Sequence, residues 1–476
     1  MTSTHRSGHA VVLGASIGGL LAARALHEHF ATVTLVDRDA LPAAAASRRG
    51  VPQDSHLHGL LARGLAAIED LLPGATADLT ARGAVPVDVQ RDFVWVNGGN
   101  PLPRAESGLR GLCVSRTTLE AYVRERVAAL PGVTVLDRHE AIGLSTSADG
   151  ETVDGAWVLP PGGEHRWLPA DLVVDATGRG NRGPEWLRAI GYEPPAEERV
   201  DAGTVYVSRD YHRTPGDAAF AGIFAGPSPA TPYGGFTIAS DGDRWMVVML
   251  GVGPEQAPPT DPDGYLAFAA TLPDPRIHAL LAAADPLTEP RRLRVPPAVR
   301  RRYESVARLP DGFVAIGDAV CTLNASYAQG MSVAAAEAVA LRESLSAGRS
   351  GLTRRFFAAT AAILDAPWEM SVGGDLGYPH VEGRRTVKTR LIGRYVARVL
   401  RAAGRDERVA RAFLRVANLM APPPSLFAPA ILGRVLRYGG AVAGQTRTGA
   451  PARSARTGAP APARDAAGGS RQAVSS

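Results

Sequence analysis

Four residues close to the N-terminus have the types and spacing of a site for a nucleotide diphosphate. The stretch "GASIGG" places Gly14, Ser16 and Gly19 in a variant of the G-x-G-x-x-G pattern, between an apolar run and a helical pattern. Gly14 permits a sharp bend, Gly19 lets helix and strand pack closely, and the helix start offers free N–H groups to an anion. Asp37 ends the next apolar run, "TVTLVD", where a carboxylate can accept hydrogen bonds from a ribose diol. These features predict a site for an adenine dinucleotide with a free 2′-hydroxyl, and a generic glycine turn is the alternative.

A second candidate stretch, "IGDAVCTLNASYAQGMS" at 316–332, follows the apolar run "GFVAI". It combines a carboxylate, Asp318, with small residues at the start of a long helical pattern. FAD and NAD both satisfy the N-terminal fingerprint, so this stretch has to distinguish between them. A helix N-cap is the structural alternative for Asp318, and it is compatible with ligand contact.

The elements that must position these residues follow an α/β pattern. "DLVVDATG" and "GFVAIGD" are buried-strand patterns that stop at small polar turns, while "AGTVYVSRDYH", "YGGFTIAS" and "RWMVVMLGV" indicate an antiparallel sheet between them. From Met331 to about Arg437 the pattern is helical, with interruptions expected at Pro367, Pro379 and "APPPS". The predicted fold class is α/β with an α+β insertion: a Rossmann-like domain, an inserted antiparallel sheet and a C-terminal helical segment.

The expected domain organisation has five parts. A nucleotide-binding domain is expected from two separate segments, and the substrate-binding sheet is inserted between them. The tail is rich in Gly, Ala, Pro, Arg and Ser and is expected to be disordered. The predicted boundaries are 1–199 and 293–345 for the nucleotide domain, 200–292 for the sheet, 346–438 for the helical region and 439–476 for the tail.

Composition excludes several classes of function. The net charge is +5, but the arginines are spread along the chain, so nucleic-acid binding is not expected. Cys113 and Cys321 are far apart, and His56 and His58 have no converging partner, so neither a disulfide framework nor a metal site is predicted. No signal peptide and no run long enough to span a bilayer is found, which indicates a cytoplasmic protein without stable membrane insertion.

The basic stretch "EGRRTVKTRLIGRYVARVLRAAGR" has apolar residues at helical spacing and arginines on the other faces. Two interpretations remain open. It is either an amphipathic helix that covers the domain with solvated arginines, or a helix that lies on a membrane surface.

The order of motifs resembles that of flavoprotein monooxygenases of the aromatic-hydroxylase type. The glycine turn, the arginine-bearing helix "SRTTLEAYVRERV", the turn "DATGRG", the inserted sheet and "GDA" before a helix follow one another as in that family. "RRGVPQDSHLH", "DLVVDATGRGNR" and "GDAVCTLNASYAQGMS" look most like actinobacterial FAD-dependent enzymes of natural-product biosynthesis, including flavin epoxidases of polyether polyketides. The resemblance spans about residues 9–440 and implies FAD as the cofactor.

The resemblance also assigns residues to the cofactor. It implies that Asp318 binds the ribitol and pyrophosphate region, that Gly330 and Met331 bring helix N–H groups towards the flavin ring, and that Arg116 contacts FAD. A solvated cation at the helix end is the alternative for Arg116. The remaining residues matched to the cofactor are Arg38, Arg48, Gly50 and Val51.

Three positions depart from the hydroxylase pattern. Ala325 stands where those enzymes have proline, and Tyr327 where they have glycine; the polyether-epoxidase-like subgroup shares the tyrosine. "DATGRGNR" replaces an Asp-Gly pair associated with nicotinamide binding. No catalytic side chain is identified, and Tyr327 is predicted either to line the substrate cavity beside the flavin or to fill the core behind it.

The expected activity is that of an FAD-dependent monooxygenase, an epoxidase or hydroxylase that uses NAD(P)H and O2 on a bulky apolar polyketide or terpenoid. In this chemistry the flavin does the difficult step while the protein positions the substrate and excludes water. Two alternatives keep the FAD site: a redox-neutral cyclase and a reductase of prenyl double bonds. The substrate, the bond attacked and the oligomeric state stay open.

Overall fold

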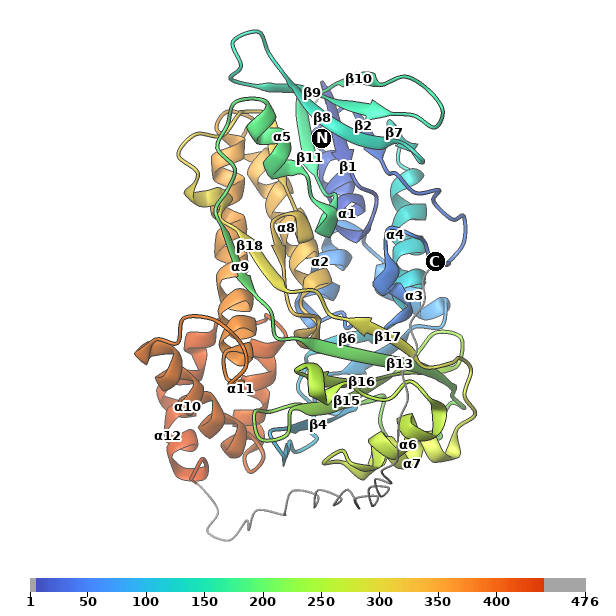
Figure 1. Cartoon of the computed structure of the whole chain (residues 1–476), viewed down its shortest axis with the longest axis vertical. Helices are drawn as coiled ribbons and strands as arrows, with labels where there is room; N and C mark the ends of the chain where they lie inside the picture. The colour runs from blue at the N-terminus through green and yellow to red at the C-terminus, as the bar shows by residue number, and fades with distance from the viewer. Residues whose placement is uncertain (1–5, 441–476) are drawn as a thin grey trace, which may run out of the picture. The chain divides into compact units, whose positions relative to one another are not determined.

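The core of the molecule is a five-stranded parallel sheet. A computed structural model describes residues 6–440, so most of the predicted tail, 441–476, lies outside the described residues. The strands β19, β11 and β1 are nearly continuous apolar runs that are buried on both faces, as is typical of parallel sheets, while β2 and β7 towards the other edge are partly exposed. Their order is β19 (Phe313–Ala315), β11 (Leu172–Asp175), β1 (His9–Leu13), β2 (Thr32–Val36) and β7 (Val133–Leu136) (Figure 1).

Helices cover this sheet and contact one another. α1 (Ile17–Leu26) connects β1 to β2 and packs against α8 (Gly330–Ser346) and α4 (Arg116–Ala128). α8 also contacts α2 (Ala62–Leu71) and α9 (Leu352–Asp375). The helix α8 therefore joins the first and the last segments of the nucleotide-binding fold. The predicted fold class is confirmed by this parallel sheet and the separate antiparallel sheet described next.

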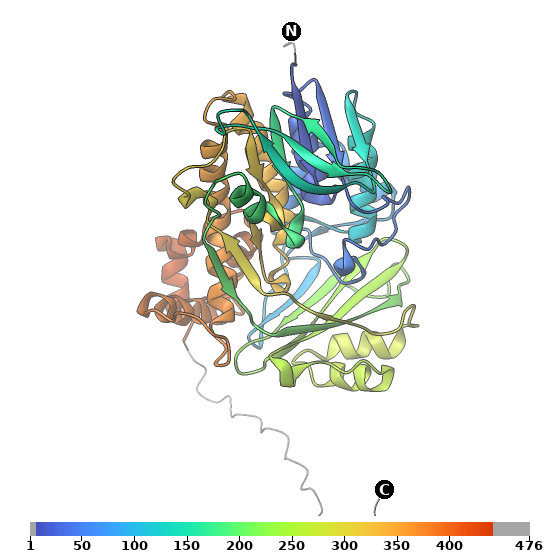
Figure 2. The same cartoon turned by 45° about the horizontal axis from the view of Figure 1, so that its top comes forward.

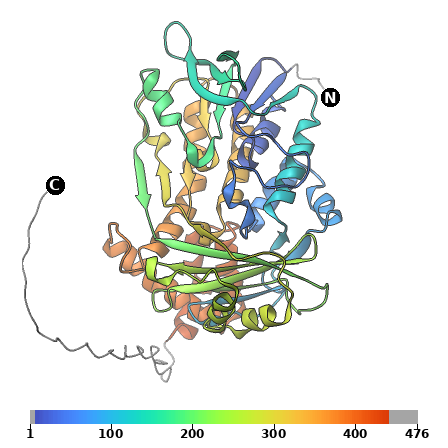
Figure 3. The ribbon, with the colours of Figure 1, turned by 45° about the vertical axis from the view of Figure 1, so that its right-hand side comes forward.

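A seven-stranded sheet forms the second layer. Figures 1 and 3 show that helices α6 (Pro262–Ala270) and α7 (Pro275–Ala283) lie on one of its faces, with the parallel-sheet domain towards the other. Except for one parallel pair, neighbouring strands are antiparallel. The strand order is β17 (Arg291–Arg294), β13 (Thr204–His212), β16 (Arg244–Val252), β15 (Tyr233–Ser240), β14 (Gly222–Gly226), β4 (Phe93–Asn97) and β5 (Asn100–Pro101).

The composition of this sheet differs from the expected insertion at 200–292. β4 and β5 come from a segment that was assigned to the nucleotide domain, and β17 extends past residue 292. The reason is the parallel pairing of β4 with β14, which places Phe93 opposite Gly222 and Trp95 opposite Phe224. Two apolar strands far apart in sequence thereby complete one buried face.

Short strands and helices complete the connections between these layers. Figure 2 shows the three-stranded antiparallel sheet β8–β10 near the N-terminal strands. The remaining elements are β3 (Val85–Asp88), β6 (Arg110–Cys113), β8 (Glu140–Thr146), β9 (Val153–Leu159), β10 (Arg166–Pro169), β12 (Glu197–Val200), β18 (Ala298–Arg301), β20 (Cys321–Thr322), α3 (Ala75–Ala81), α5 (Gly183–Ala189), η1 (Pro52–Ser55), η2 (Gly178–Gly180), η3 (Pro254–Gln256), η4 (Tyr303–Ser305), η5 (Gly317–Ala319), η6 (Ala325–Tyr327) and η7 (Pro423–Phe427).

The C-terminal region consists of helices. After α9 come α10 (Val387–Ala403), α11 (Glu407–Ala417) and α12 (Pro429–Tyr438). The expected interruption at Pro367 is wrong, because this proline lies inside α9. Proline removes one backbone donor, but Leu364 and Trp368 on either side of it are buried in the main core, and this packing keeps the helix continuous. The chain does leave the α-helical conformation around Pro379 and at "APPPS", where the 3-10 helix η7 begins.

Candidate functional site at the carboxyl edge of the parallel sheet

The candidate site is built at the carboxyl ends of β1, β2, β11 and β19. In open α/β sheets this edge is where ligands bind, because successive loops converge there. The loop after β1 contacts the loop after β11, since a methyl group at Gly14 would overlap the Ala176 carbonyl. The turns η2 and η5, which follow β11 and β19, also contact each other.

The turn after β1 has the backbone geometry that its sequence predicts. Gly14 has a φ of 110°, which side-chain-bearing residues rarely adopt, and its N–H donates to Val36 O at 2.7 Å. A side chain at Gly19 would overlap the Gly14 carbonyl. Ser16 is the N-cap residue of α1, but its side chain makes no capping hydrogen bond. The N-terminal N–H groups of α1 are thereby left free of a side-chain cap, as an anion site requires.

A network of charged side chains surrounds this helix start. Ser16 Oγ accepts a hydrogen bond from Arg116 Nη2 at 2.7 Å and donates to Glu120 Oε2 at 3.1 Å. Arg48 Nε donates to Glu120 Oε1 at 2.8 Å, and Arg48 Nη1 pairs with Asp39 Oδ2 at 2.8 Å. Burial disfavours the charged form of Arg48 and by itself would lower its pKa. The neighbouring carboxylates together have the larger effect, so the pKa of this guanidinium is raised. Arg48 and Arg116 are thus brought together by one acid, Glu120.

Arg116 has a hydrogen-bonding group left over for a ligand. It is the first residue of α4, which begins here because Ser115 Oγ accepts a hydrogen bond from Thr118 N at 3.3 Å. The Arg116 side chain is buried, and burial lowers the pKa of its guanidinium. Its Nε finds no hydrogen-bond partner among residues 6–440. A buried donor beside a free helix N-terminus fits a diphosphate, and it does not fit the solvated cation considered as the alternative.

Asp37 lies at the end of β2, as predicted, but its carboxylate already has protein partners. Oδ2 accepts from Ala15 N at 2.7 Å, and Oδ1 accepts from Asp39 N at 2.9 Å and from Arg48 Nη1 at 3.2 Å. The second acceptor position of Oδ2 is occupied only by Arg48 Nη1 at 3.4 Å, a longer contact that a ribose hydroxyl can replace. Asp37 therefore also fixes the glycine turn and Arg48 in place.

Asp318 lies at the same edge of the parallel sheet, in the turn that follows the edge strand β19. It lies inside the turn η5, whose N-cap is Ile316, so it is not the helix N-cap that the sequence allowed as an alternative. Its Oδ2 accepts from Arg179 Nε at 3.1 Å. Both side chains are partly exposed, so this pair is open to a ligand.

The helix α8 connects the two halves of the site. A methyl group at Gly18 of α1 or at Gly317 of η5 would be in ordinary van der Waals contact with Ala334 of α8, at 3.7 Å. Gly330 is the exposed first residue of α8, and Met331 behind it is buried. The start of α8 therefore lies beside both the glycine turn and the Asp318 turn.

The other residues assigned from the sequence take different places. Gly50 N donates to Asp39 Oδ2 at 2.7 Å, which attaches its loop to the charged network, and Val51 is buried next to it. Arg38 is exposed. Glu120 and Arg179 were given no role from the sequence. A signal for Glu120 was present, because it follows Arg116 by four residues on one helix, the spacing at which oppositely charged side chains pair.

The two histidines of "QDSHLH" take different places: His56 contacts the large sheet, and His58 lies near two arginines of the site. His56 Nδ1 shares a hydrogen bond with Ser208 Oγ of β13 at 2.8 Å. Burial and, to a smaller extent, the guanidinium groups of Arg116 and Arg179 lower the pKa of His58 to about 3, so His58 is a neutral imidazole beside both arginines. Residues 6–440 contain no group of three or more His, Cys, Asp and Glu side chains that could hold a metal ion.

Tyr327 follows Asp318 in the loop that leads to α8, and its side chain contacts the C-terminal end of α9. Its hydroxyl donates to Asp375 Oδ1 at 3.3 Å, and a methyl group at Gly374 would overlap it. Asn324 Nδ2 donates to both oxygens of the same carboxylate, at 3.0 and 3.1 Å. Burial raises the pKa of Asp375 to about 6, which leaves a carboxyl group able to exchange a proton near neutral pH. Tyr206 of β13 joins this network, because its hydroxyl donates to Ser326 Oγ at 3.2 Å.

The sheet face opposite these loops is aromatic. Trp95 and Phe224 stack with ring centroids 4.5 Å apart, and Phe93 and Phe236 pack on Phe224 at 5.2 and 5.4 Å. Leu57, between the two histidines, packs against this cluster. The edge of the parallel sheet thus carries polar groups, and the large sheet carries a mostly buried aromatic cluster across from them.

A buried carboxyl group under the Asp318 turn makes a pH-dependent contribution to stability. Glu337 of α8 is fully buried, and its Oε2 accepts from Gly317 N at 2.7 Å. Burial raises its pKa to about 8. Between pH 4.5 and 8 the folded chain therefore holds a proton that the unfolded chain releases, so stability falls as the pH rises through this window.

We expect the Glu337→Gln variant to lose this dependence, because its amide keeps an acceptor for Gly317 N but does not titrate. The free energy of unfolding of the wild type should fall by about 1 kcal/mol per pH unit relative to the variant in this window. Urea unfolding of both proteins at several pH values measures the difference. Parallel pH profiles would contradict the buried proton.

Comparisons with known proteins connect this architecture to a family. A scan against family models found no match. Protein Rv3254 of Mycobacterium tuberculosis is 35% identical over 448 residues, which cover 90% of this chain and 93% of that protein.

Solved structures share the fold at low sequence identity. The flavin-dependent brominase Bmp2 superposes with a TM-score of 0.63 at 16% identity, covering 90% of this chain and 98% of Bmp2. A flavoprotein/dehydrogenase from Cytophaga hutchinsonii gives 0.65 at 15% identity, with coverage of 90% and 98%. PqsL, a probable FAD-dependent monooxygenase from Pseudomonas aeruginosa, gives 0.58 at 16%, with coverage of 78% and 97%. The chain has the fold of these flavin-dependent enzymes and belongs to the same family as Protein Rv3254.

Proposed function

We propose that the chain is an FAD-dependent monooxygenase that uses NAD(P)H and O2 to oxidise a bulky apolar natural-product intermediate, a polyketide or terpenoid, in the cytoplasm. The observation that carries this proposal is the convergence at one sheet edge of the uncapped α1 N-terminus, the unpartnered Arg116 Nε and the Asp318 turn. The fold shared with flavin-dependent enzymes supports it.

Each part of the site has a role in holding the cofactor. The N–H groups of α1 and Arg116 would bind the pyrophosphate, Asp37 the ribose, and Asp318 the ribitol side. Arg48, Gly50 and Val51 would line the cofactor, and Gly330 and Met331 would carry the start of α8 towards the ring. FAD supplies the redox chemistry and the activation of oxygen, while the side chains of this protein bind, orient and exclude water.

The substrate class follows from the surface across from this edge. The aromatic row of Phe93, Trp95, Phe224 and Phe236 is suited to an extended apolar molecule. Tyr327 matches the tyrosine of the polyether-epoxidase-like subgroup, which supports an alkene as the reacting group. In this arrangement Asp375 would accept or return a proton at the substrate through the Tyr327 hydroxyl.

One observation favours a redox-neutral cyclase as the second candidate. The "DATGRGNR" turn replaces the pair associated with nicotinamide binding. Its Asp175 is fully buried and accepts hydrogen bonds from Thr177 N at 3.0 Å and Thr177 Oγ1 at 2.6 Å. This carboxylate is directed into the protein, which removes it from contact with a nicotinamide.

Anaerobic reduction distinguishes these candidates. NADPH or NADH should bleach the FAD-loaded protein in the absence of oxygen, and air should restore the oxidised spectrum. With a panel of apolar alkenes, a monooxygenase consumes NAD(P)H and O2 in equal amounts per product. A cyclase consumes neither, and a prenyl reductase consumes NAD(P)H alone, so either of these outcomes would refute the monooxygenase.

The Asp37→Asn variant tests the ribose contact. The amide keeps an acceptor for Ala15 N but loses the charge, so FAD affinity should fall by about 10- to 150-fold. Asp39→Asn is the matched control, because it also removes a carboxylate from Arg48 but does not approach the ribose, and its loss should be smaller. Equal FAD dissociation constants for Asp37→Asn and the wild type would show that Asp37 is not the ribose acid.

A further inference from the structure

The apolar stripe of α10 continues beyond the part of the helix that the protein covers. In its C-terminal half, Val399 and Ala402 are buried against the neighbouring helices. Leu391 and Ile392 lie about two turns earlier on the same side, yet they are 58% and 42% exposed. Val387, one turn further, is 64% exposed. An apolar stripe that is half covered is typical of a helix with a second partner.

A second segment extends this apolar surface. Phe427 of η7 is 50% exposed and stacks on Tyr395 of α10, with ring centroids 4.2 Å apart and planes 16° from parallel. The Tyr395 hydroxyl donates to Leu426 O at 2.7 Å, which fixes this arrangement. We call the exposed apolar residues the α10 patch; they are Val387, Leu391, Ile392 and Phe427.

Basic side chains border the α10 patch. Arg390 and Arg394 are exposed one turn apart on α10, and neither is paired with a carboxylate within residues 6–440. Helix α10 itself contains no Asp or Glu. Lys388, the single lysine of the sequence, makes one ion pair, 3.6 Å from Glu369.

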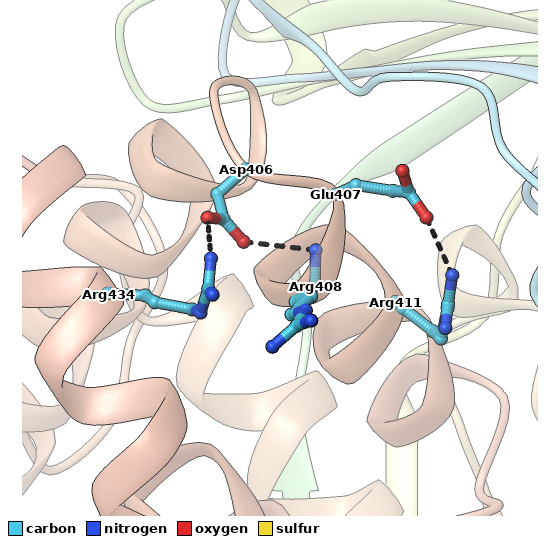
Figure 4. Close-up of a pocket in the computed structure, with 5 residues that line it drawn as sticks. All are labelled: Asp406, Glu407, Arg408, Arg411 and Arg434. Atoms are coloured by element: carbon cyan, nitrogen blue, oxygen red, sulfur yellow. Dashed lines mark hydrogen bonds and ion pairs between the residues drawn. The ribbon is translucent and has the colours of Figure 1, made fainter.

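Some other arginines of the C-terminal helices are paired with carboxylates or bonded to backbone carbonyls. Figure 4 shows the hollow at the start of α11, where Arg434 pairs with Asp406 and Arg411 pairs with Glu407 at 2.6 Å. Arg398 of α10 donates to Leu436 O at 3.0 Å at the end of α12. Arg390 and Arg394, in contrast, have neither kind of partner within residues 6–440 and keep their positive charge next to the exposed apolar residues.

We propose that the α10 patch docks on an anionic lipid bilayer, with the N-terminal half of α10 lying in the interface. Exposed apolar residues enter the headgroup boundary, and Arg390 and Arg394 contact lipid phosphates. A second copy of this chain is disfavoured as the occupant, because a two-fold contact through this patch would place the same arginines against each other. No helix within residues 6–440 is both long and apolar enough to cross a membrane, so the contact is peripheral. This proposal does not depend on the cofactor or the reaction.

Sedimentation with vesicles tests the proposal on the full chain. The wild type should bind vesicles of phosphatidylcholine with phosphatidylglycerol and should not bind vesicles of phosphatidylcholine alone. The Arg390→Glu/Arg394→Glu and Leu391→Ser/Ile392→Ser variants should each bind the anionic vesicles about tenfold or more weakly. High salt should release the wild type, because the charge contribution is screened.

Matched variants on other surfaces provide the controls. Arg188 and Arg354 are exposed on α5 and α9, and Arg188→Glu/Arg354→Glu changes the net charge equally. Leu159 and Leu287 are exposed elsewhere, and Leu159→Ser/Leu287→Ser removes as many leucine-sized side chains. Both controls should keep wild-type binding to anionic vesicles.

Three outcomes would overturn the proposal. They are failure of the wild type to bind anionic vesicles, equal loss of binding in control and patch variants, and a concentration-dependent dimer that Leu391→Ser/Ile392→Ser abolishes. The last result would assign the α10 patch to a second copy of the chain.

Discussion

Replacing Gly14 with alanine is expected to abolish FAD binding and to lower the free energy of unfolding by about 2–6 kcal/mol. Gly14 has a φ of 110°, and an alanine methyl group would overlap the Ala176 carbonyl of the neighbouring loop. Relief of this overlap would separate the two loops that form the sheet edge. Chemical unfolding and FAD titration of the variant measure both effects.

Gly18→Ala is the matched control for this prediction, because it adds the same methyl group within the same turn. There the methyl group meets only Ala334, at an ordinary 3.7 Å, and Gly18 lies in a helix, where alanine is favoured. This variant should bind FAD and should be at least as stable as the wild type. Equal behaviour of the two alanine variants would mean that the turn does not hold the cofactor.

Tyr327→Ala is expected to lower the free energy of unfolding by about 3–5 kcal/mol while the folded fraction still binds FAD. The side chain packs against Gly374 of α9, and its loss also leaves Asp375 without one hydrogen-bond donor. Product formation by the folded fraction should fall or change, because we propose that the Tyr327 hydroxyl links Asp375 to the substrate.

Tyr327→Phe separates packing from the hydroxyl. It keeps the ring and removes only the bond to Asp375, so its stability should fall by about 1 kcal/mol. Melting temperature, bound FAD and NAD(P)H-dependent product are measured on both variants. A Tyr327→Ala protein of reduced stability whose folded fraction turns over normally would assign Tyr327 to the core alone.

The local parts of the site could be predicted from the sequence because their geometry depends on neighbouring residues. The bend at Gly14 and the position of Asp37 at the end of β2 follow from short-range spacing. The same holds for the strand before Asp318, since the short apolar run "GFVAI" stops at a small polar turn.

The remaining features depend on contacts between distant segments. Arg48 meets Glu120 only because the loop after β2 folds onto α4, and no local pattern encodes that pairing. The pairing of β4 with β14 and the continuity of α9 through Pro367 likewise result from tertiary packing that overrides local signals. Tyr327 was singled out from the sequence as a candidate cavity or core residue, but its partner Asp375 lies on another helix and carries no motif.

FAD binding at the carboxyl edge of the parallel sheet is the property that the proposed function requires first. The purified full chain, incubated with FAD and passed through a desalting column, should retain about one FAD per chain and release it on denaturation, because the proposed contacts are all non-covalent. Flavin absorbance and a thermal unfolding curve on the same sample give the occupancy and show that the chain is folded. A chain that unfolds cooperatively yet retains no FAD, and whose melting temperature does not rise with added FAD, would contradict the assignment of this sheet edge as a flavin site.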